Sequence, residues 1–225
     1  MINEKSLKAV KRSIFSSHFR KPLYRSYCFS RIPSTIEHLL TGQKRSTLPN
    51  DCFEKEIYDA VVLLFIDGFG WRFFEKYFEQ FPFLQRFIDK GIASKITSQF
   101  PSTTAAHVTS INTNLEVGQT GIYEWFYYEP IADEVIAPLN FSIAGDKVLG
   151  NLEKKGVTPQ AIFPENEFYA KLKKKQIDTF IIQPEDVVHS PYSCRITLGA
   201  HPVSYRTLDQ WHHPMRRPMC TPPYS

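Results

Sequence analysis

The feature that most constrains the fold is an apolar run, Val61 to Ile66, that stops at Asp67-Gly68 within YDAVVLLFIDGFGW. The run has the length of one strand and is rich in β-branched and aromatic residues. A strand that is apolar on both faces is typical of a parallel sheet covered by helices on each side. We therefore expect a buried parallel strand at 61–66, with Asp67 at its carboxyl end, where open α/β sheets bind their ligands.

Strand and helix patterns alternate along the rest of the chain, which favours an α/β fold with a mainly parallel sheet flanked by helices. We expect helices over 33–42, 71–90 with an interruption at Pro82, 102–114, 147–155 and 165–175. We expect strands over 92–100, 161–163 and 178–183, and loops or short strands over 121–144.

Composition divides the chain into a basic N-terminal extension with a short helix (1–50), a central domain (51–210) and an irregular tail (211–225). The extension holds ten Lys and Arg residues against only Glu4 and Glu37. Such an arm can bind nucleic acid or anionic lipid, but a solvated leader is the simpler interpretation, and we do not expect a nucleic-acid partner. The tail WHHPMRRPMCTPPYS has four prolines and no helix or strand pattern, which indicates disorder or a shifted reading frame.

Several classes of protein do not fit the sequence. No apolar run of about 18 residues occurs, so we expect no membrane span. The basic N-terminus is not followed by the apolar region of a secretory signal. The four cysteines are scattered without CxxC spacing, which indicates free thiols and a cytoplasmic location.

The stretch FPSTTAAHVTSINT, from Phe100 to Thr113, places several hydroxyls at the expected start of a helix. The N-terminus of a helix favours an anion, and a threonine there could attack phosphorus if its hydroxyl were activated. On local evidence alone, an ordinary N-cap at Ser102 or Thr103 is the favoured interpretation, and Asp67 could merely cap a turn. If strands 61–66 and 92–100 are neighbours, Asp67 and these hydroxyls lie at the same edge of the sheet.

The run from VVLLFIDGFGW to FPSTTAAHVTSINTNLEVGQTGIYEWFYYEP resembles the type I phosphodiesterase/nucleotide pyrophosphatase branch of the alkaline phosphatase superfamily. The resemblance implies that Asp67 binds a metal. It also implies that Thr104 is both the nucleophile and a ligand of the same metal, with Thr103 as the alternative if the register slips by one. His107 stands close to where the eukaryotic enzymes have an oxyanion-binding Asn, so it is expected either to contact the substrate or to pack in the protein.

This family builds a centre of two metal ions, normally Zn²⁺, whose other ligands form a D-x-x-x-H motif, a D-H pair and a later His. Asp186 and His189 are one residue short of that spacing, and His212-His213 lies in the tail. The resemblance therefore implies an alkaline-phosphatase-like domain that is truncated, incomplete at its C-terminal end, and lacks most metal ligands.

The function implied is metal-dependent hydrolysis of a small phosphodiester or nucleotide substrate, impaired by the missing ligands. Two alternatives stay open. One is another activity of the superfamily, such as that of a phosphomonoesterase or phosphomutase, whereas Thr104 argues against a sulfatase. The other is a remnant that binds phosphate or nucleotide without catalysis.

Overall fold

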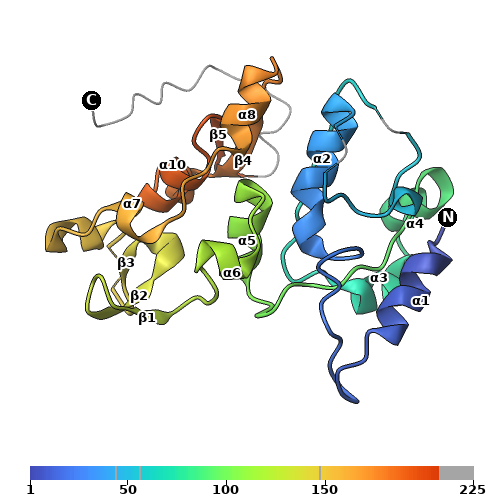
Figure 1. The fold of residues 1–225 in the computed structure, drawn as a ribbon, viewed down its shortest axis with the longest axis horizontal. Helices are drawn as coiled ribbons and strands as arrows, with labels where there is room; N and C mark the ends of the chain where they lie inside the picture. The colour runs from blue at the N-terminus through green and yellow to red at the C-terminus, as the bar shows by residue number, and fades with distance from the viewer. Residues whose placement is uncertain (44, 56, 147, 208–225) are drawn as a thin grey trace. The chain divides into compact units, whose positions relative to one another are not determined.

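The computed structural model describes residues 1–43, 45–55, 57–146 and 148–207, so the predicted tail at 211–225 lies outside the described residues. The chain divides into two compact units, residues 1–107 and 108–225 (Figure 1). The three parts expected from composition, residues 1–50, 51–210 and 211–225, do not coincide with these two units. The three-part division stays a prediction.

The first unit is built mainly from helices. They are α1 (Glu4–Arg12), α2 (Ile32–Thr41), α3 (Trp71–Tyr77) and α4 (Pro82–Lys90), and α5 (Thr104–Thr113) begins in this unit and continues into the next. Helix α2 has Pro33 in its first turn and ends at Gly42, whose φ of 70° lies in the left-handed region. The break between α3 and α4 falls at Pro82 as expected, because proline is favoured at the start of a helix and disrupts its interior.

The apolar run 61–66 is not a strand, so the prediction of a buried parallel strand there is wrong. Most of the run is exposed, with exposed fractions of 90% at Val62 and 54% at Leu64. A strand is stabilised by hydrogen-bonded neighbours, and none of the described strands pairs with this segment. The run therefore has the composition of a strand but belongs to neither of the described sheets.

The predicted strand at 92–100 is reduced to two single parallel bridges, which pair Ala93 with Ile2 and Thr97 with Cys28. Both partners come from the basic N-terminal extension. The side-chain amide of Asn3 donates a further hydrogen bond to Oγ of Ser94, at 2.9 Å. The extension is thus an integral part of the first unit and not a solvated leader.

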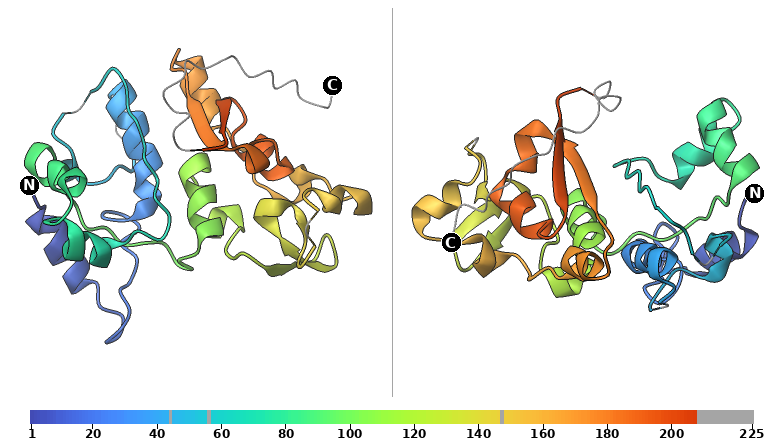
Figure 2. Two further views of the ribbon diagram at one scale, coloured as in Figure 1. Left: turned by 180° about the vertical axis from the view of Figure 1, so that it is seen from behind. Right: turned by 90° about the horizontal axis from the view of Figure 1, so that it is seen from above.

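The second unit contains two small sheets. Strands β1 (Tyr127–Glu129), β2 (Glu134–Ala137) and β3 (Ser142–Ile143) form an antiparallel sheet, and β4 (Phe180–Pro184) pairs in parallel with β5 (His201–Tyr205). The helices are α6 (Val117–Thr120), α7 (Pro159–Ile162), α8 (Phe168–Lys174), α9 (Glu185–Val188) and α10 (Pro191–Ile196) (Figure 2). Helices α9 and α10 form the crossover that parallel pairing of β4 and β5 requires.

The fold is therefore a mixture of helices and sheets with a small parallel sheet, which is consistent with an α/β class. The expected mainly parallel sheet stays a prediction, because the three-stranded sheet is antiparallel and the two-stranded sheet is parallel. The strand expected at 161–163 is also wrong: Pro159 opens helix α7 there. The helix expected at 147–155 is a 3₁₀ helix over Asn151–Lys155.

Aromatic rings pack against one another in the core of the second unit. The ring of Phe163 lies 5.5 Å from that of Phe141 and 5.2 Å from that of Tyr192. In α8, Phe168, Tyr169 and Leu172 form a second buried cluster. In the part of the chain that the structure describes, no helix has both the length and the apolar character needed to cross a membrane.

Candidate active site

The two threonines that open helix α5 make different contacts. The hydroxyl of Thr103 accepts a hydrogen bond from the N–H of Ala106 at 3.3 Å, which is the bond of a helix N-cap. The carbonyl of Thr103 accepts the N–H of His107 at 3.1 Å, the first backbone bond of the helix. The hydroxyl of Thr104, the first helical residue, donates instead to Oδ2 of Asp67 at 2.9 Å.

Asp67 reaches Thr104 from a turn that follows the apolar run. Gly68 has a φ of 71°, a left-handed conformation that glycine adopts without the strain a side chain would bring. The Asp67 carboxylate is exposed, so a ligand can reach the pair it forms with Thr104. The structure thus brings together two of the predicted site residues, although they are far apart in sequence and the strand expected before Asp67 is absent.

His107, the third predicted site residue, is buried and turned towards the main chain. Its Nε2 accepts the N–H of Gln99 at 3.2 Å, and its Nδ1 lies 2.8 Å from the carbonyl oxygen of Thr103. A backbone N–H can only donate, so Nε2 carries no proton and Nδ1–H donates to Thr103. Burial lowers the pKa of His107, while the Thr103 carbonyl and the Asp67 charge act in the opposite direction.

An aromatic contact joins this histidine to the segment before Asp67. The ring of Phe29 packs at 4.6 Å on the ring of His107 and at 5.5 Å on that of Phe65. Phe29 therefore helps to hold the Asp67 turn beside the start of α5. Sequence reasoning missed Phe29 and Gln99, because Phe29 lies in the basic extension and Gln99 acts through its backbone.

The described residues do not fit a complete metal centre. Asp67 and Thr104 offer two oxygen ligands, whereas zinc sites take three or four ligands from the protein. No group of three or more His, Cys, Asp or Glu residues that could hold a metal occurs among the described residues. His212 and His213, considered as ligands from the sequence, lie outside them.

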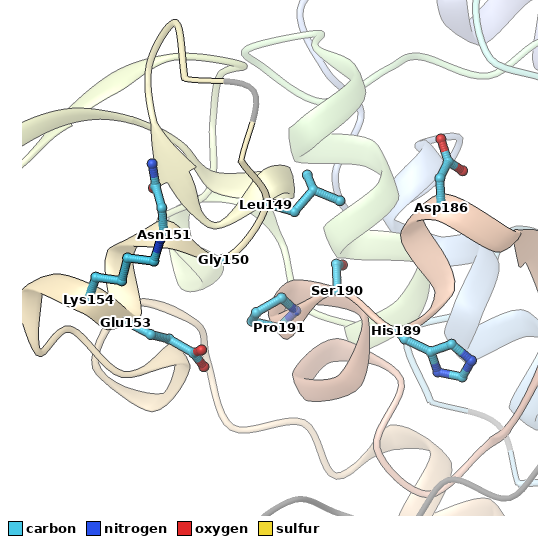
Figure 3. A pocket seen from close by; sticks show the side chains of 9 residues that line it. All are labelled: Leu149, Gly150, Asn151, Glu153, Lys154, Asp186, His189, Ser190 and Pro191. Carbon is cyan, nitrogen blue, oxygen red and sulfur yellow. The ribbon is translucent and has the colours of Figure 1, made fainter.

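Asp186 and His189, the residues with near-motif spacing, lie in the second unit at a pocket of about 400 Å³ (Figure 3). Lys154 and Glu153 line the same pocket. Figure 3 shows the side chains of Asp186 and His189 pointing in different directions, so they do not converge on one point. The geometry gives no support for a shared metal ion at this pair.

A comparison with models of known protein families matches most of the chain to one family. Residues 61–215 match a family model described as Type I phosphodiesterase / nucleotide pyrophosphatase. The match covers more than half of the chain and includes Asp67, Thr104 and His107, which confirms the resemblance drawn from the motifs. Searches of the curated proteins and of the solved structures found no match.

Proposed function

Because the chain belongs to the type I phosphodiesterase / nucleotide pyrophosphatase family, we propose that it hydrolyses phosphodiester or pyrophosphate bonds with Thr104 as nucleophile. The observation that carries this proposal is the 2.9 Å hydrogen bond from the Thr104 hydroxyl to Asp67. The neighbouring Thr103 hydroxyl serves as the helix cap, so the contacts of the pair favour Thr104 for chemistry.

In the proposed reaction, a phosphate group lies at the N-terminus of α5, where the helix dipole favours negative charge. Oγ1 of Thr104 attacks phosphorus, the bond from phosphorus to the leaving oxygen breaks, and Asp67 accepts the hydroxyl proton. Water then attacks the phosphothreonine and releases the phosphate product.

The family is generally metal-dependent, and a bound metal would supply charge stabilisation at the phosphate. Asp67 and Thr104 would be two of its ligands, but the described residues do not complete even one zinc site, so no step of the reaction is assigned to a metal. The same shortage of ligands supports the proposal that the activity of this chain is impaired.

His107 was expected from the sequence either to contact the substrate or to pack in the protein. Both of its ring nitrogens are engaged with the main chain at Gln99 and Thr103. We propose that His107 positions the start of α5, and through it Thr104, without touching the phosphate.

The test uses the full chain with bis(p-nitrophenyl) phosphate, with and without added Zn²⁺. Acid quenching followed by peptide mass analysis should find a phosphoryl adduct at Thr104, accompanied by slow release of p-nitrophenol. Both signals should disappear in Thr104→Ala and persist in the matched variant Thr103→Ala. Turnover that survives in Thr104→Ala, or an adduct at Thr103, would exclude the proposed nucleophile.

A binding protein without catalytic activity is the second candidate, favoured by the incomplete ligand set. Isothermal titration with a nucleotide in the absence of metal separates it from an enzyme. Binding without any adduct or turnover would favour this candidate. A parallel assay with p-nitrophenyl phosphate distinguishes a phosphomonoesterase from a phosphodiesterase.

A further inference from the structure

A loop that follows α1, residues 13–21 (SIFSSHFRK), exposes three large apolar side chains. The exposed fractions are 63% for Ile14, 78% for Phe15 and 65% for Phe19. The loop is held closed, because the N–H of Lys21 donates to the carbonyl of Ser13 at 2.6 Å and that of Phe15 to Phe19 at 3.1 Å. A bridge between Ile14 and Arg20 adds to this closure. We call residues 13–21 the apolar hairpin.

The apolar hairpin extends away from the helices of its unit, as the blue loop after α1 shows in Figures 1 and 2. Burying the side chains of Phe15 and Phe19 would remove a large apolar area from water, and a folded chain normally places such side chains inside. Their exposure on a closed loop marks an interaction site.

The charges around the hairpin identify the partner. Residues 5–36 contain eight Lys and Arg residues and no Asp or Glu. The members closest in sequence to the hairpin are exposed: Lys8, Lys11, Arg12, Arg20, Lys21 and Arg25. Within the described part of the chain, none of these six forms an ion pair with a carboxylate. Their positive charge is therefore available to an external anion.

We propose that the apolar hairpin and its surrounding cations bind the surface of an anionic phospholipid bilayer. The aromatic side chains enter the boundary between headgroups and acyl chains, and the cations contact the lipid phosphates and carboxylates. Stable attachment to a membrane surface takes two signals, and this loop combines an apolar insertion with a polybasic patch. The binding needs neither a spanning helix nor a functional active site.

A single-stranded nucleic acid is the partner to be distinguished, because its bases stack on exposed aromatic rings beside basic side chains. The two partners make different demands on Phe15 and Phe19. A bilayer accepts any large apolar side chain, whereas a base needs an aromatic ring. Replacing both residues with Leu therefore separates the partners.

The experiment measures co-sedimentation of the full chain with vesicles of phosphatidylcholine and phosphatidylserine, and with vesicles of phosphatidylcholine alone. We expect binding to the anionic vesicles that weakens with added salt. The double variant Phe15→Glu/Phe19→Glu should lower the partition coefficient by at least about tenfold. Arg20→Glu/Lys21→Glu should lower it by at least about 25-fold, because each lost cation contributes about fivefold near an anionic surface and the new carboxylates are repelled by it.

Matched controls carry the same chemical changes at other exposed sites. Phe83→Glu/Phe87→Glu changes two exposed phenylalanines of α4, and Lys173→Glu/Lys174→Glu changes two exposed lysines of α8. Both controls should keep the partition coefficient within about twofold of the original chain. Circular dichroism checks that all the variants fold.

Phe15→Leu/Phe19→Leu should retain vesicle binding. The proposal is overturned if the original chain does not bind anionic vesicles, or if the controls reduce binding as much as the hairpin variants do. It is also overturned if the Leu variant loses vesicle binding, or if the chain binds a single-stranded oligonucleotide in preference to the vesicles.

Discussion

Adjacent residues Thr103 and Thr104 divide two tasks at the start of α5. A helix leaves its first N–H groups without partners in the helix, and Thr103 satisfies one of them with its hydroxyl. With the cap made by Thr103, the hydroxyl of Thr104 is directed to Asp67. The sequence alone left open whether these hydroxyls form a cap or carry out chemistry, and the contacts show a cap at one residue and a carboxylate partner at the next.

Alanine substitutions at the two threonines should therefore have different effects on stability. Thr103→Ala should lower the free energy of unfolding by about 1 kcal/mol, because it leaves the Ala106 N–H without its cap. Thr104→Ala should lower it by less than about 0.5 kcal/mol, because an exposed hydrogen bond exchanges readily with water. Urea denaturation of both variants measures the difference, and equal effects would contradict this division of tasks.

His107 should make stability depend on pH. Burial is the largest cause that lowers its pKa, and protonation of Nε2 would also break the bond from the Gln99 N–H. Because the unfolded chain binds the proton more readily, the free energy of unfolding should fall as the pH decreases below the ordinary value of 6.5. Above that pH, His107 is neutral in both states and contributes no slope.

The non-titrating variant His107→Asn isolates this contribution. The free energy of unfolding of the original chain, measured in urea at several pH values, should decrease more steeply below pH 6.5 than that of the variant. The Asp67 carboxylate attracts the protonated ring and so reduces the size of the effect without reversing it. Identical pH profiles would show that burial of His107 does not govern its protonation.

At the scale of elements, the close approach of Gly199 to α8 explains why a glycine stands there. Its φ is 98°, and a Cβ atom added at this position would lie 2.8 Å from the backbone nitrogen of Ala170. The next residue, Ala200, packs against the buried cluster formed by Phe168, Tyr169 and Leu172. Glycine thus lets the chain that leads into β5 pass directly over the start of α8.

Gly199→Ala should lower the free energy of unfolding by about 2 to 4 kcal/mol, because backbone strain adds to a clash with main-chain atoms. The matched variant Gly118→Ala lies in α6, where an added Cβ meets nothing within 4 Å. It should leave stability unchanged or raise it by up to about 1 kcal/mol, because alanine favours a helix. Thermal unfolding followed by circular dichroism compares the two, and a small loss at Gly199 would show that α8 shifts to accept the methyl group.

Helices were predicted better than strands because their signals are local. Proline at the start and glycine at the end mark α2 within twelve residues of sequence, and Pro82 separates α3 from α4. A strand depends on partners elsewhere in the chain, which a pattern of apolar residues does not reveal. Val61 to Ile66 has the composition of a buried strand, yet no described strand pairs with it.

The candidate site was predictable in part for the same reason. Asp67 and Thr104 could be found because each occupies a local motif, and family resemblance joined the two. The hydrogen bonds of His107 and its contact with Phe29 could not be found, since they depend on tertiary packing with the N-terminal extension. An exposed histidine and a packed one look identical in sequence.

At the scale of the whole molecule, the apolar run 61–66 should govern solubility. Its exposed side chains and its lack of a strand partner among the described residues leave backbone groups open to pairing with another chain. We expect the purified chain to associate increasingly with concentration and to gain strand content as it does so. Leu64→Lys should reduce this association, because a charge within the run opposes pairing of strands.

The matched control is Leu198→Lys, since Leu198 and Leu64 have exposed fractions of 55% and 54% but Leu198 lies in a turn after α10. If strand pairing drives association, light scattering against concentration should fall for Leu64→Lys and stay near the original value for Leu198→Lys. If exposed apolar area alone drives it, the two variants should improve solubility equally. Infrared spectra of the associated material supply the second criterion, because pairing through the run requires new intermolecular strands that Leu64→Lys removes and Leu198→Lys retains.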